Sequence, residues 1–361
     1  MRTYRIALIP GDGIGREVMP VGVAALEAAA GLADGFRLDF QELPWSCEYY
    51  LQHGRMMPED GLETLRGFDA IYLGAVGWPE RVPDHVSLWG LLLPIRKAFD
   101  LYANVRPCRL LPGIEGPLRG KGPDEINFVV VRENTEGEYS GVGGRVHIGT
   151  PWEVAVQDIV FTRRAVERII RFAFDLARRE GRRRVTSVTK SNAMQFNMVF
   201  WDEVFWQVAG EFPDIAADQC HVDAMAARFV RAPEQLDVLV ASNLFADILT
   251  DLAGALQGSL GLSPSANITH DRTVPSMFEP VHGSAPDIAG KGIANPLAAV
   301  WAGAMMLEFL GERQAAAAVM RGIERVTAQR SALTPDLGGR ATTAECGAAV
   351  VEAIRTARPG A

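Results

Sequence analysis

Short apolar segments alternate with helix-forming segments near the N-terminus, and this alternation limits the folds that the chain can adopt. An apolar run at 4–10 leads into a glycine-rich turn at 11–15, and a helical pattern follows over 16–30. Further apolar runs at 37–43 and 70–74 have the length and composition of strands. Because strands that alternate with helices form parallel sheets covered by helices, the sequence predicts an α/β fold.

The middle of the chain has a different pattern. A short apolar run at 126–131 is expected to be a buried strand, and the glycine-rich stretch 137–149 predicts an irregular or hairpin-like excursion. Helical patterns are expected at 163–179, 196–212 and 244–260, before a long Gly/Pro-punctuated loop at 275–296.

With 361 residues, the chain is longer than a usual single domain, so we expect two domains or one large domain. The change of pattern favours a middle domain at 102–257, with 1–101 and 258–361 joining to form the other domain. The balance of 36 basic and 44 acidic residues gives a net charge of -8. This balance disfavours nucleic acid as the main partner.

The sequence has no stretch of the roughly 20 apolar residues that span a bilayer, and its first ten residues do not have the pattern of a signal peptide. Four scattered cysteines form no CxxC pair and have no histidine at metal-ligand spacing: Cys47, Cys108, Cys220 and Cys346. Such cysteines are typical of reduced thiols. We therefore expect a cytoplasmic protein with no membrane partner.

The turn at 11–15 invites comparison with the dinucleotide-binding fingerprint GxGxxG. Gly11 and Gly13 match it, but Arg16 stands where the third glycine belongs. A tight strand-to-helix turn and a ligand-contacting loop both remain open.

Two carboxylates one helical turn apart give the strongest local signal. Asp247 and Asp251 share one face of a helix that Ser242 or Asn243 can cap, and no cation stands one turn away from either. An all-oxygen site suits Mg²⁺ or Mn²⁺, and Asp223 could supply a third oxygen. A solvated helix face or a distant arginine partner would also explain this spacing.

Three arginines lie at the ends of expected elements: Arg96, Arg106 and Arg132. Arg132 directly follows a buried strand, and the carboxyl ends of strands in α/β sheets are where ligands bind. Guanidinium groups match carboxylates, so three converging arginines would suit a dicarboxylic acid. Lys190 follows another expected strand and could act as a base, and Tyr139 could act as an acid. Each of these five residues alone also fits an ordinary structural role.

Together these segments resemble the isocitrate/isopropylmalate dehydrogenase family, the β-decarboxylating dehydrogenases. The resemblance runs over nearly the whole chain, through the stretches 9–15, 242–251, 277–292 and 334–339. It implies a two-domain, isopropylmalate-dehydrogenase-like α/β fold that is not Rossmann. The family has a discontinuous large domain, a smaller α/β domain with a dimerisation arm, and a homodimer whose active sites are shared between subunits.

The resemblance also implies roles for individual residues. Those that bind substrate carboxylates would be Arg96, Arg106 and Arg132. Those that bind Mn²⁺ or Mg²⁺ would be Asp247 and Asp251, with Asp223 of the partner subunit. Lys190 of the partner subunit would take the hydroxyl proton, and Tyr139 would protonate the enol after CO₂ leaves. Activation by K⁺ is a further family expectation.

The cofactor site implied by the resemblance comprises Asn192, Glu279, His282, Gly283, Ser284, Ala285, Asp287, Ile288 and Asn295. Asp287 can accept hydrogen bonds from both ribose hydroxyls of NAD and would repel the 2′-phosphate of NADP. The cofactor is therefore expected to be NAD.

The stretch 85–96 is similar to that of family members that oxidise tartrate or D-malate, with Trp89 where isopropylmalate enzymes generally have glutamate. A tryptophan there would shrink the substrate pocket, unless Trp89 only packs in the core. The expected reactions convert D-malate to pyruvate and CO₂, and meso-tartrate to glycerate. The alternatives are a 3-isopropylmalate dehydrogenase and a catalytically silent regulatory subunit.

Overall fold

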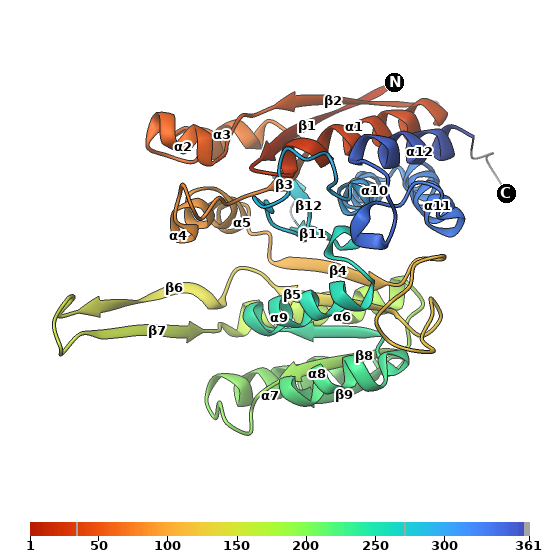
Figure 1. The fold of residues 1–361 in the computed structure, drawn as a ribbon. Helices are drawn as coiled ribbons and strands as arrows, with labels where there is room; N and C mark the ends of the chain where they lie inside the picture. Colours follow the sequence, from red (N-terminus) through yellow and green to blue (C-terminus); the bar gives the residue numbers. More distant parts are fainter. Residues whose placement is uncertain (34, 271, 357–361) are drawn as a thin grey trace. The chain divides into compact units, whose positions relative to one another are not determined.

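A computed structural model describes residues 1–33, 35–270 and 272–356. The chain forms two compact units (Figure 1). The first contains Met1–Leu101, Arg109–Ile126 and the segment that starts at Gly254. The second contains Tyr102–Cys108 and Asn127–Ala253. The first unit is therefore built from segments far apart in the sequence, with the second unit inserted between them.

The first unit has a mostly parallel sheet. Its strands, in spatial order, are β2 (Phe36–Glu42), β1 (Arg2–Gly11), β3 (Ala70–Ala75), β12 (Ser276–Pro280) and β11 (Pro264–Ile268). The β1–β2, β1–β3 and β3–β12 pairs are parallel, and β11 runs antiparallel to β12. The parallel sheet predicted from the alternating pattern is confirmed.

Strand β12 corrects the prediction of a loop over 275–296. Its five residues are all buried, but Pro275 precedes them and Pro280 is the last of them, and these prolines gave the segment the composition of a loop. Proline has no N–H group to donate to a sheet, and it is tolerated at the ends of a strand because no such hydrogen bond is needed there.

Helices of the first unit pack in two groups. The first group comprises α1 (Gly15–Leu32), α10 (Leu297–Leu310), α11 (Arg313–Gln329) and α12 (Thr343–Arg355). The second comprises α2 (Cys47–His53), α3 (Gly61–Arg66), α4 (Asp84–Ser87), the π-helical turn η1 (Leu88–Leu92) and α5 (Leu93–Ala98). Short 3₁₀ turns lie at Leu260–Leu262 and Pro335–Leu337. The hydroxyl of Tyr72 on β3 donates to the carbonyl of Ala299 at 2.6 Å, which joins the sheet to α10.

The second unit also consists of strands and helices. Its strands, in spatial order, are β4 (Ala103–Arg109), β5 (Asn127–Glu133), β10 (Val238–Ala241), β8 (Arg184–Thr189) and β9 (Ala216–His221). The last four are parallel to one another. The helices are α6 (Arg163–Arg179), α7 (Asn197–Ala209), α8 (Val222–Arg231) and α9 (Asn243–Leu256), and a 3₁₀ turn lies at Pro233–Gln235. The three predicted helices are confirmed, although α7 and α9 end three and four residues early.

A two-stranded antiparallel hairpin extends from the second unit (Figure 1). It is formed by β6 (Gly137–Val146) and β7 (Val154–Val160), whose side chains are mostly exposed. The predicted hairpin-like excursion at 137–149 is confirmed, and the structure extends it to Val160.

The segment 109–126 packs within the first unit, whereas the sequence pattern alone places it in a middle domain at 102–257. Gly113 has φ +79°, and a Cβ atom there would lie 2.2 Å from the Thr327 carbonyl oxygen. Arg330 donates to the Gly113 carbonyl at 3.0 Å and pairs with Glu115 at 2.8 Å. These contacts tie an irregular segment to the end of α11, which no periodic pattern could reveal.

The glycine-rich turn joins β1 tightly to α1 and also contacts another loop. Gly13 has φ +52°, and a Cβ atom there would lie 2.0 Å from the Ser284 carbonyl oxygen, which accepts a hydrogen bond from Ile14 N at 2.8 Å. Arg16 Nε donates to the Gly11 carbonyl at 3.1 Å, so the residue that breaks the fingerprint closes the turn.

All four cysteines are buried as free thiols. Among the helices of the described residues, none has both the length and the apolarity needed to cross a membrane.

Asp12 links three loops of the first unit, and its substitution should destabilise that unit. Its buried carboxylate accepts hydrogen bonds from Cys47 N and Gly77 N, both at 2.9 Å. Asp12→Ala leaves two buried N–H groups without an acceptor, which should lower the unfolding free energy by about 3 kcal/mol in urea titrations. Asp12→Asn keeps one acceptor and should lose about half as much. A change below ~0.5 kcal/mol in the alanine variant would contradict this account.

Candidate active site

Five predicted site residues come together in the second unit. Arg106 lies on β4, Arg132 on β5 and Tyr139 on β6, while Asp247 and Asp251 lie one turn apart on α9. Hydrogen bonds join the first three to Asp247. A small region at the carboxyl end of β5 therefore combines two guanidinium groups, two carboxylates and a phenol.

Arg132 is almost fully buried, with 2% of its surface exposed. Its Nε donates to Asn243 Oδ1 at 2.9 Å, and its Nη1 donates to Asp247 Oδ1. Its guanidinium carbon also lies 5.6 Å from the centre of the Tyr139 ring. A buried cation needs a counter-charge, so Asp247 stabilises Arg132 in this position.

Arg106 approaches the same carboxylate from the neighbouring strand. Its Nε donates to Asn104 Oδ1 at 2.8 Å, and its Nη1 lies 2.5 Å from Thr250 Oγ1 and 3.4 Å from Asp247 Oδ1. Thr250 and Asn104 thus orient a second guanidinium beside Asp247.

Tyr139 and Asp251 complete this cluster. The Tyr139 hydroxyl donates to Asp247 Oδ2 at 3.2 Å. Burial, followed by the charge of Asp247, raises the pKa of Tyr139, so the phenol keeps its proton at neutral pH. Desolvation and the charge of Asp247 also raise the pKa of Asp251, against the influence of Arg106 and Arg132.

Glu138 and Glu136, which sequence reasoning did not assign, hold the start of α9 together with the predicted cap residues Ser242 and Asn243. The carboxylate of Glu138, which is 7% exposed, accepts from Ser242 Oγ at 2.8 Å and from Leu244 N at 3.1 Å. Asn243 Nδ2 donates to the Glu136 carbonyl at 3.2 Å. Only the position of Glu138 beside Tyr139 could have suggested it from the sequence, because its partners lie more than 100 residues away.

Lys190 and Asp223 form a separate pair in the second unit. Lys190 follows β8 and its Nζ lies 2.9 Å from Asp223 Oδ1 on α8. A hydrogen bond from Lys190 lowers the pKa of Asp223. Asn192 follows in an exposed turn. The ends of β8 and β9 therefore bring a lysine and a carboxylate together. This pair is separate from the cluster around Asp247.

The acidic side chains of one chain do not assemble a complete metal site. Among the described residues, no three His, Cys, Asp or Glu side chains gather closely enough to hold an ion. Asp247 and Asp251 supply carboxylate oxygens on one helix face, the donor type that Mg²⁺ and Mn²⁺ prefer. These two residues fit such an ion if further oxygens come from a substrate or from a second chain.

The predicted residues of the first unit form contacts of their own. Arg96 on α5 is 4% exposed, and its Nη2 donates to Glu279 Oε1 on β12 at 2.7 Å. Asn267 Nδ2 donates to the same oxygen at 2.8 Å. The Nε atom of Arg96 is buried without a hydrogen-bond partner among the described residues. An oriented, incompletely satisfied guanidinium of this kind is suited to an anionic ligand.

Trp89 is not a core residue, because 45% of its surface is exposed. It lies in the π-helical turn Leu88–Leu92, and the ammonium of Lys97 sits 4.4 Å from the centre of its ring. Burial lowers the pKa of Lys97. The interpretation of Trp89 as a packing residue therefore does not agree with the structure.

The loop after β12 carries most of the predicted cofactor residues and is tied to the start of α1. The carboxylate of Glu17 accepts from Gly290 N at 2.5 Å and from Gly292 N at 2.9 Å. Ser284 is buried against Ile14, Ala285 has φ +42°, and Asp287 is exposed, while Gly283, also exposed, and Ile288 lie in the same loop. The predicted loop residues are thus held together, but sequence reasoning missed Glu17.

His282 and Asn295 lie at the two ends of this loop. Burial lowers the pKa of His282, and its Nε2 has no hydrogen-bond partner among the described residues. Asn295 Nδ2 donates to Asp336 Oδ2 at 2.9 Å, and its Oδ1 accepts from Leu297 N at 3.0 Å. The neutral imidazole therefore leaves a nitrogen available to a ligand, whereas Asn295 also caps α10.

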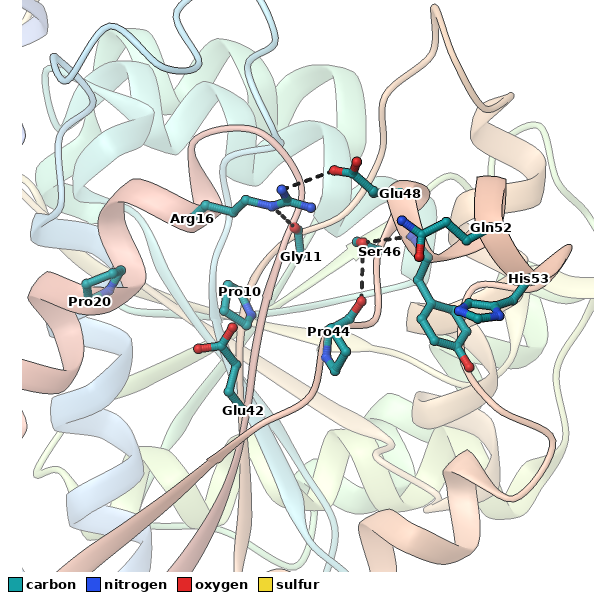
Figure 2. A pocket seen from close by; sticks show the side chains of 11 residues that line it. Pro10, Gly11, Arg16, Pro20, Glu42, Pro44, Ser46, Glu48, Gln52 and His53 are labelled. Atoms are coloured by element: carbon teal, nitrogen blue, oxygen red, sulfur yellow. Dashed lines mark hydrogen bonds and ion pairs between the residues drawn. The ribbon is translucent and has the colours of Figure 1, made fainter.

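A separate hollow of about 510 Å³ opens in the first unit between the ends of β1 and β2 and the helices α1 and α2 (Figure 2). Arg16 forms part of its wall and pairs with Glu48 at 3.2 Å. None of the predicted site residues lines this hollow.

Comparisons with known proteins agree over nearly the full length. The family model described as isocitrate/isopropylmalate dehydrogenase matches residues 5–353. The chain is 56% identical over 360 residues to D-malate dehydrogenase (decarboxylating) of Escherichia coli K12, covering 98% of this chain and 99% of the relative. It is 53% identical over 359 residues to tartrate dehydrogenase/decarboxylase of Pseudomonas putida, covering 98% of each.

A solved structure shows the same fold. The crystal structure of isocitrate dehydrogenase from Methylococcus capsulatus matches with a TM-score of 0.88 at 38% identity, covering 98% of this chain and 100% of that chain. The expected fold class is confirmed.

Glu133, next to Arg132, should make stability fall as the pH rises. Burial raises the pKa of its carboxyl from 4.5 to about 7, although Thr135 and Glu136 donate hydrogen bonds to it. Between these values the folded chain binds more protons than the unfolded chain, so the unfolding free energy declines with rising pH. Relative to Glu133→Gln, wild type should lose up to about 3 kcal/mol from pH 4.5 to 7 in denaturant titrations. An unchanged difference across this range would refute the assignment.

Proposed function

The chain belongs to the isocitrate/isopropylmalate dehydrogenase family, and from that premise we propose that it oxidises D-malate or tartrate with NAD and a divalent metal ion, then decarboxylates the keto acid. The protein is an oxidoreductase that acts on a CH–OH group. The observation that carries the proposal is the convergence of Arg106, Arg132 and Tyr139 on Asp247, one helical turn from Asp251.

In this proposal the arginines bind the carboxylates of a diacid. Arg106 and Arg132 each present a guanidinium that a neighbouring asparagine orients, so little side-chain entropy is lost when a carboxylate binds. The family resemblance adds Arg96 of the first unit to this set. The three positive charges of these arginines balance the two negative charges of the substrate and the negative charge of Asp247 nearby.

The proposed metal ligands are Asp247 and Asp251, with Asp223 of the partner subunit. A bound Mn²⁺ or Mg²⁺ would polarise the C2 oxygen and stabilise the negative charge that develops there. In the single chain, Arg106 and Arg132 provide the positive charge beside Asp247. Asp251 is more exposed than Asp247, and its pKa is raised. Both features agree with a metal ligand whose negative charge a bound cation would stabilise.

The proposed proton transfers use two residues. Lys190 Nζ of the partner subunit takes the proton of the C2 hydroxyl. NAD, when bound by the loop from His282 to Asn295, would supply the acceptor for the hydride on C2. The bond between C3 and its carboxylate then breaks, CO₂ leaves, and the electron pair stays with the substrate as an enolate. Tyr139 Oη donates a proton to C3, a role that its raised pKa supports.

The cofactor proposal rests on the loop from His282 to Asn295. Asp287 is exposed and available to accept hydrogen bonds from the two ribose hydroxyls of NAD. The other proposed contacts are Asn192, Glu279, Gly283, Ser284, Ala285 and Ile288. Ile14 and Glu17 hold this loop in place, which should lower the entropy lost on binding.

Trp89 is the proposed basis of substrate choice. Its exposed indole would limit the space for a branched or third-carboxylate substituent. The names of the relatives, D-malate dehydrogenase (decarboxylating) and tartrate dehydrogenase/decarboxylase, support a small diacid.

A homodimer with shared active sites is also proposed. The second unit exposes large apolar side chains on its hairpin and helices, a feature typical of interaction surfaces. They are Val142, Val146, Ile148, Trp152, Val154, Val156, Val160, Phe196, Val199, Trp206, Val230 and Ile248. The pairing of Lys190 with Asp223, away from Asp247, supports their donation as a unit to a second chain. The four buried thiols support a cytoplasmic location.

A substrate panel tests this function. With NAD, Mn²⁺ or Mg²⁺, and K⁺, purified protein should turn over D-malate or tartrate with a kcat/KM at least about tenfold above that for 3-isopropylmalate, because Trp89 restricts the pocket. NADH and CO₂ are measured together, and NADP replaces NAD in a parallel series. A wide preference for 3-isopropylmalate would refute the substrate assignment. Comparable turnover with NADP would refute the role of Asp287. Inactivity on every acid would support a catalytically silent subunit.

Asp247→Asn should abolish turnover in a protein that still folds, with a lowered melting temperature because buried Arg132 loses its counter-charge. The amide is nearly isosteric but binds a divalent cation weakly, so kcat should fall by at least about a hundredfold. Circular dichroism and the melting temperature report the fold, and Asp214→Asn, which breaks a surface pair with Arg178, is the matched control. Normal activity of Asp247→Asn after chelator treatment would overturn the proposed metal site.

A further inference from the structure

The base of the β6–β7 hairpin is joined to the start of α9 by one buried carboxylate. Glu138 accepts from Ser242 Oγ at 2.8 Å and from Leu244 N at 3.1 Å. Ser242 Oγ in turn lies 3.4 Å from Phe245 N, which it caps. Two of the N–H groups that a helix leaves unsatisfied at its N-terminus are thus bound through this pair.

The backbone at the start of β6 also lies close to side chains, including that of Asn243 at the start of α9. Gly137 has φ +78°, and a Cβ atom there would lie 3.0 Å from the Phe161 ring and 3.7 Å from Asn243 Cβ. Asn243 Nδ2 donates to the Glu136 carbonyl at 3.2 Å. The carboxylate of Glu138 therefore lies inside a close junction. If its hydrogen bonds to Ser242 and Leu244 were lost, water could not readily replace them there.

The next residue on β6 is Tyr139, whose hydroxyl lies 3.2 Å from Asp247 Oδ2. Asp247 is one turn along α9 from Leu244, the residue that Glu138 binds. Two consecutive residues of β6 thus contact two successive levels of one helix. Fixing the first contact sets the strand's position along the helix axis, and this position determines where the Tyr139 hydroxyl lies.

We propose that Glu138 is a positioning residue, whose carboxylate anchors β6 to the N-terminus of α9 and so holds the Tyr139 hydroxyl against Asp247. The catalytic part of this inference rests on the proposed function, in which Tyr139 donates the proton to C3. The anchor itself depends only on the junction between β6 and α9.

The principal variant is Glu138→Gln, which keeps the side-chain size but can accept fewer hydrogen bonds from Ser242 and Leu244. A bond to a charged group is lost, so amide hydrogen exchange at 137–141 and 244–248 should be about tenfold faster or more. Glu136→Gln is the matched control, because its carboxylate binds Thr162 N and Oγ1 instead of α9. Its exchange should rise near Thr162 and stay unchanged at 244–248.

Steady-state kinetics separate positioning from a purely structural cap. In Glu138→Gln, kcat for the preferred diacid should fall about tenfold, while KM stays within about twofold because Arg106 and Arg132 keep their contacts. In a Tyr139→Phe background, Glu138→Gln should cause no further loss of kcat. An equal loss in both backgrounds would overturn the role in positioning Tyr139.

Ser242→Ala tests the anchor if Glu138→Gln does not fold. It removes one of the two hydrogen bonds to Glu138, and exchange at 137–141 should rise by a smaller factor in the same direction. Unchanged exchange of β6 in this variant would overturn the anchor. If wild type acts on none of the acids, the proposed function fails, whereas the exchange measurements still support or overturn the anchor.

Discussion

The carboxylate of Asp247 is the interaction on which the second unit's site depends. Two arginines from neighbouring strands and one phenol contact it, and Arg132 is nearly fully buried. Burying the guanidinium of Arg132 without an anion would cost free energy. Placing the carboxylate of Asp247 beside Asp251 without a cation would also cost free energy. The charges therefore hold each other in place, and this balance keeps β4, β5, β6 and α9 together where the strands end.

Periodic patterns were sufficient for the long helices of the second unit. The helix at Arg163–Arg179 agrees residue for residue with its prediction, because it has an amphipathic face and a threonine caps its start. Strand β12 was missed because one proline precedes it and another ends it, and a short apolar run has no period of its own. The segment 109–126 has no pattern at all, and only its contacts with Arg330 and Thr327 place it in the first unit.

The site shows the same division. Spacing on α9 identified Asp247 and Asp251, and strand ends identified Arg132 and Lys190. Glu138, Glu17 and the contact of Asn243 with Arg132 could not be found in this way, because each acts through backbone or side-chain groups that are distant in sequence. Trp89 lies in a π-helical turn and is exposed, which the sequence left open.

The interrupted sequence of the first unit has a consequence for the order of folding during synthesis. Strand β3 pairs with β1 on one side and with β12 on the other, and β12 is made about 200 residues later. By then the ribosome has produced the whole insert. Until β12 is made, the edge of β3 that β12 occupies in the folded protein is unpaired and open to mispairing. Slow translation beyond residue 253 would prolong that vulnerable interval, and chaperone binding at this stage would protect it.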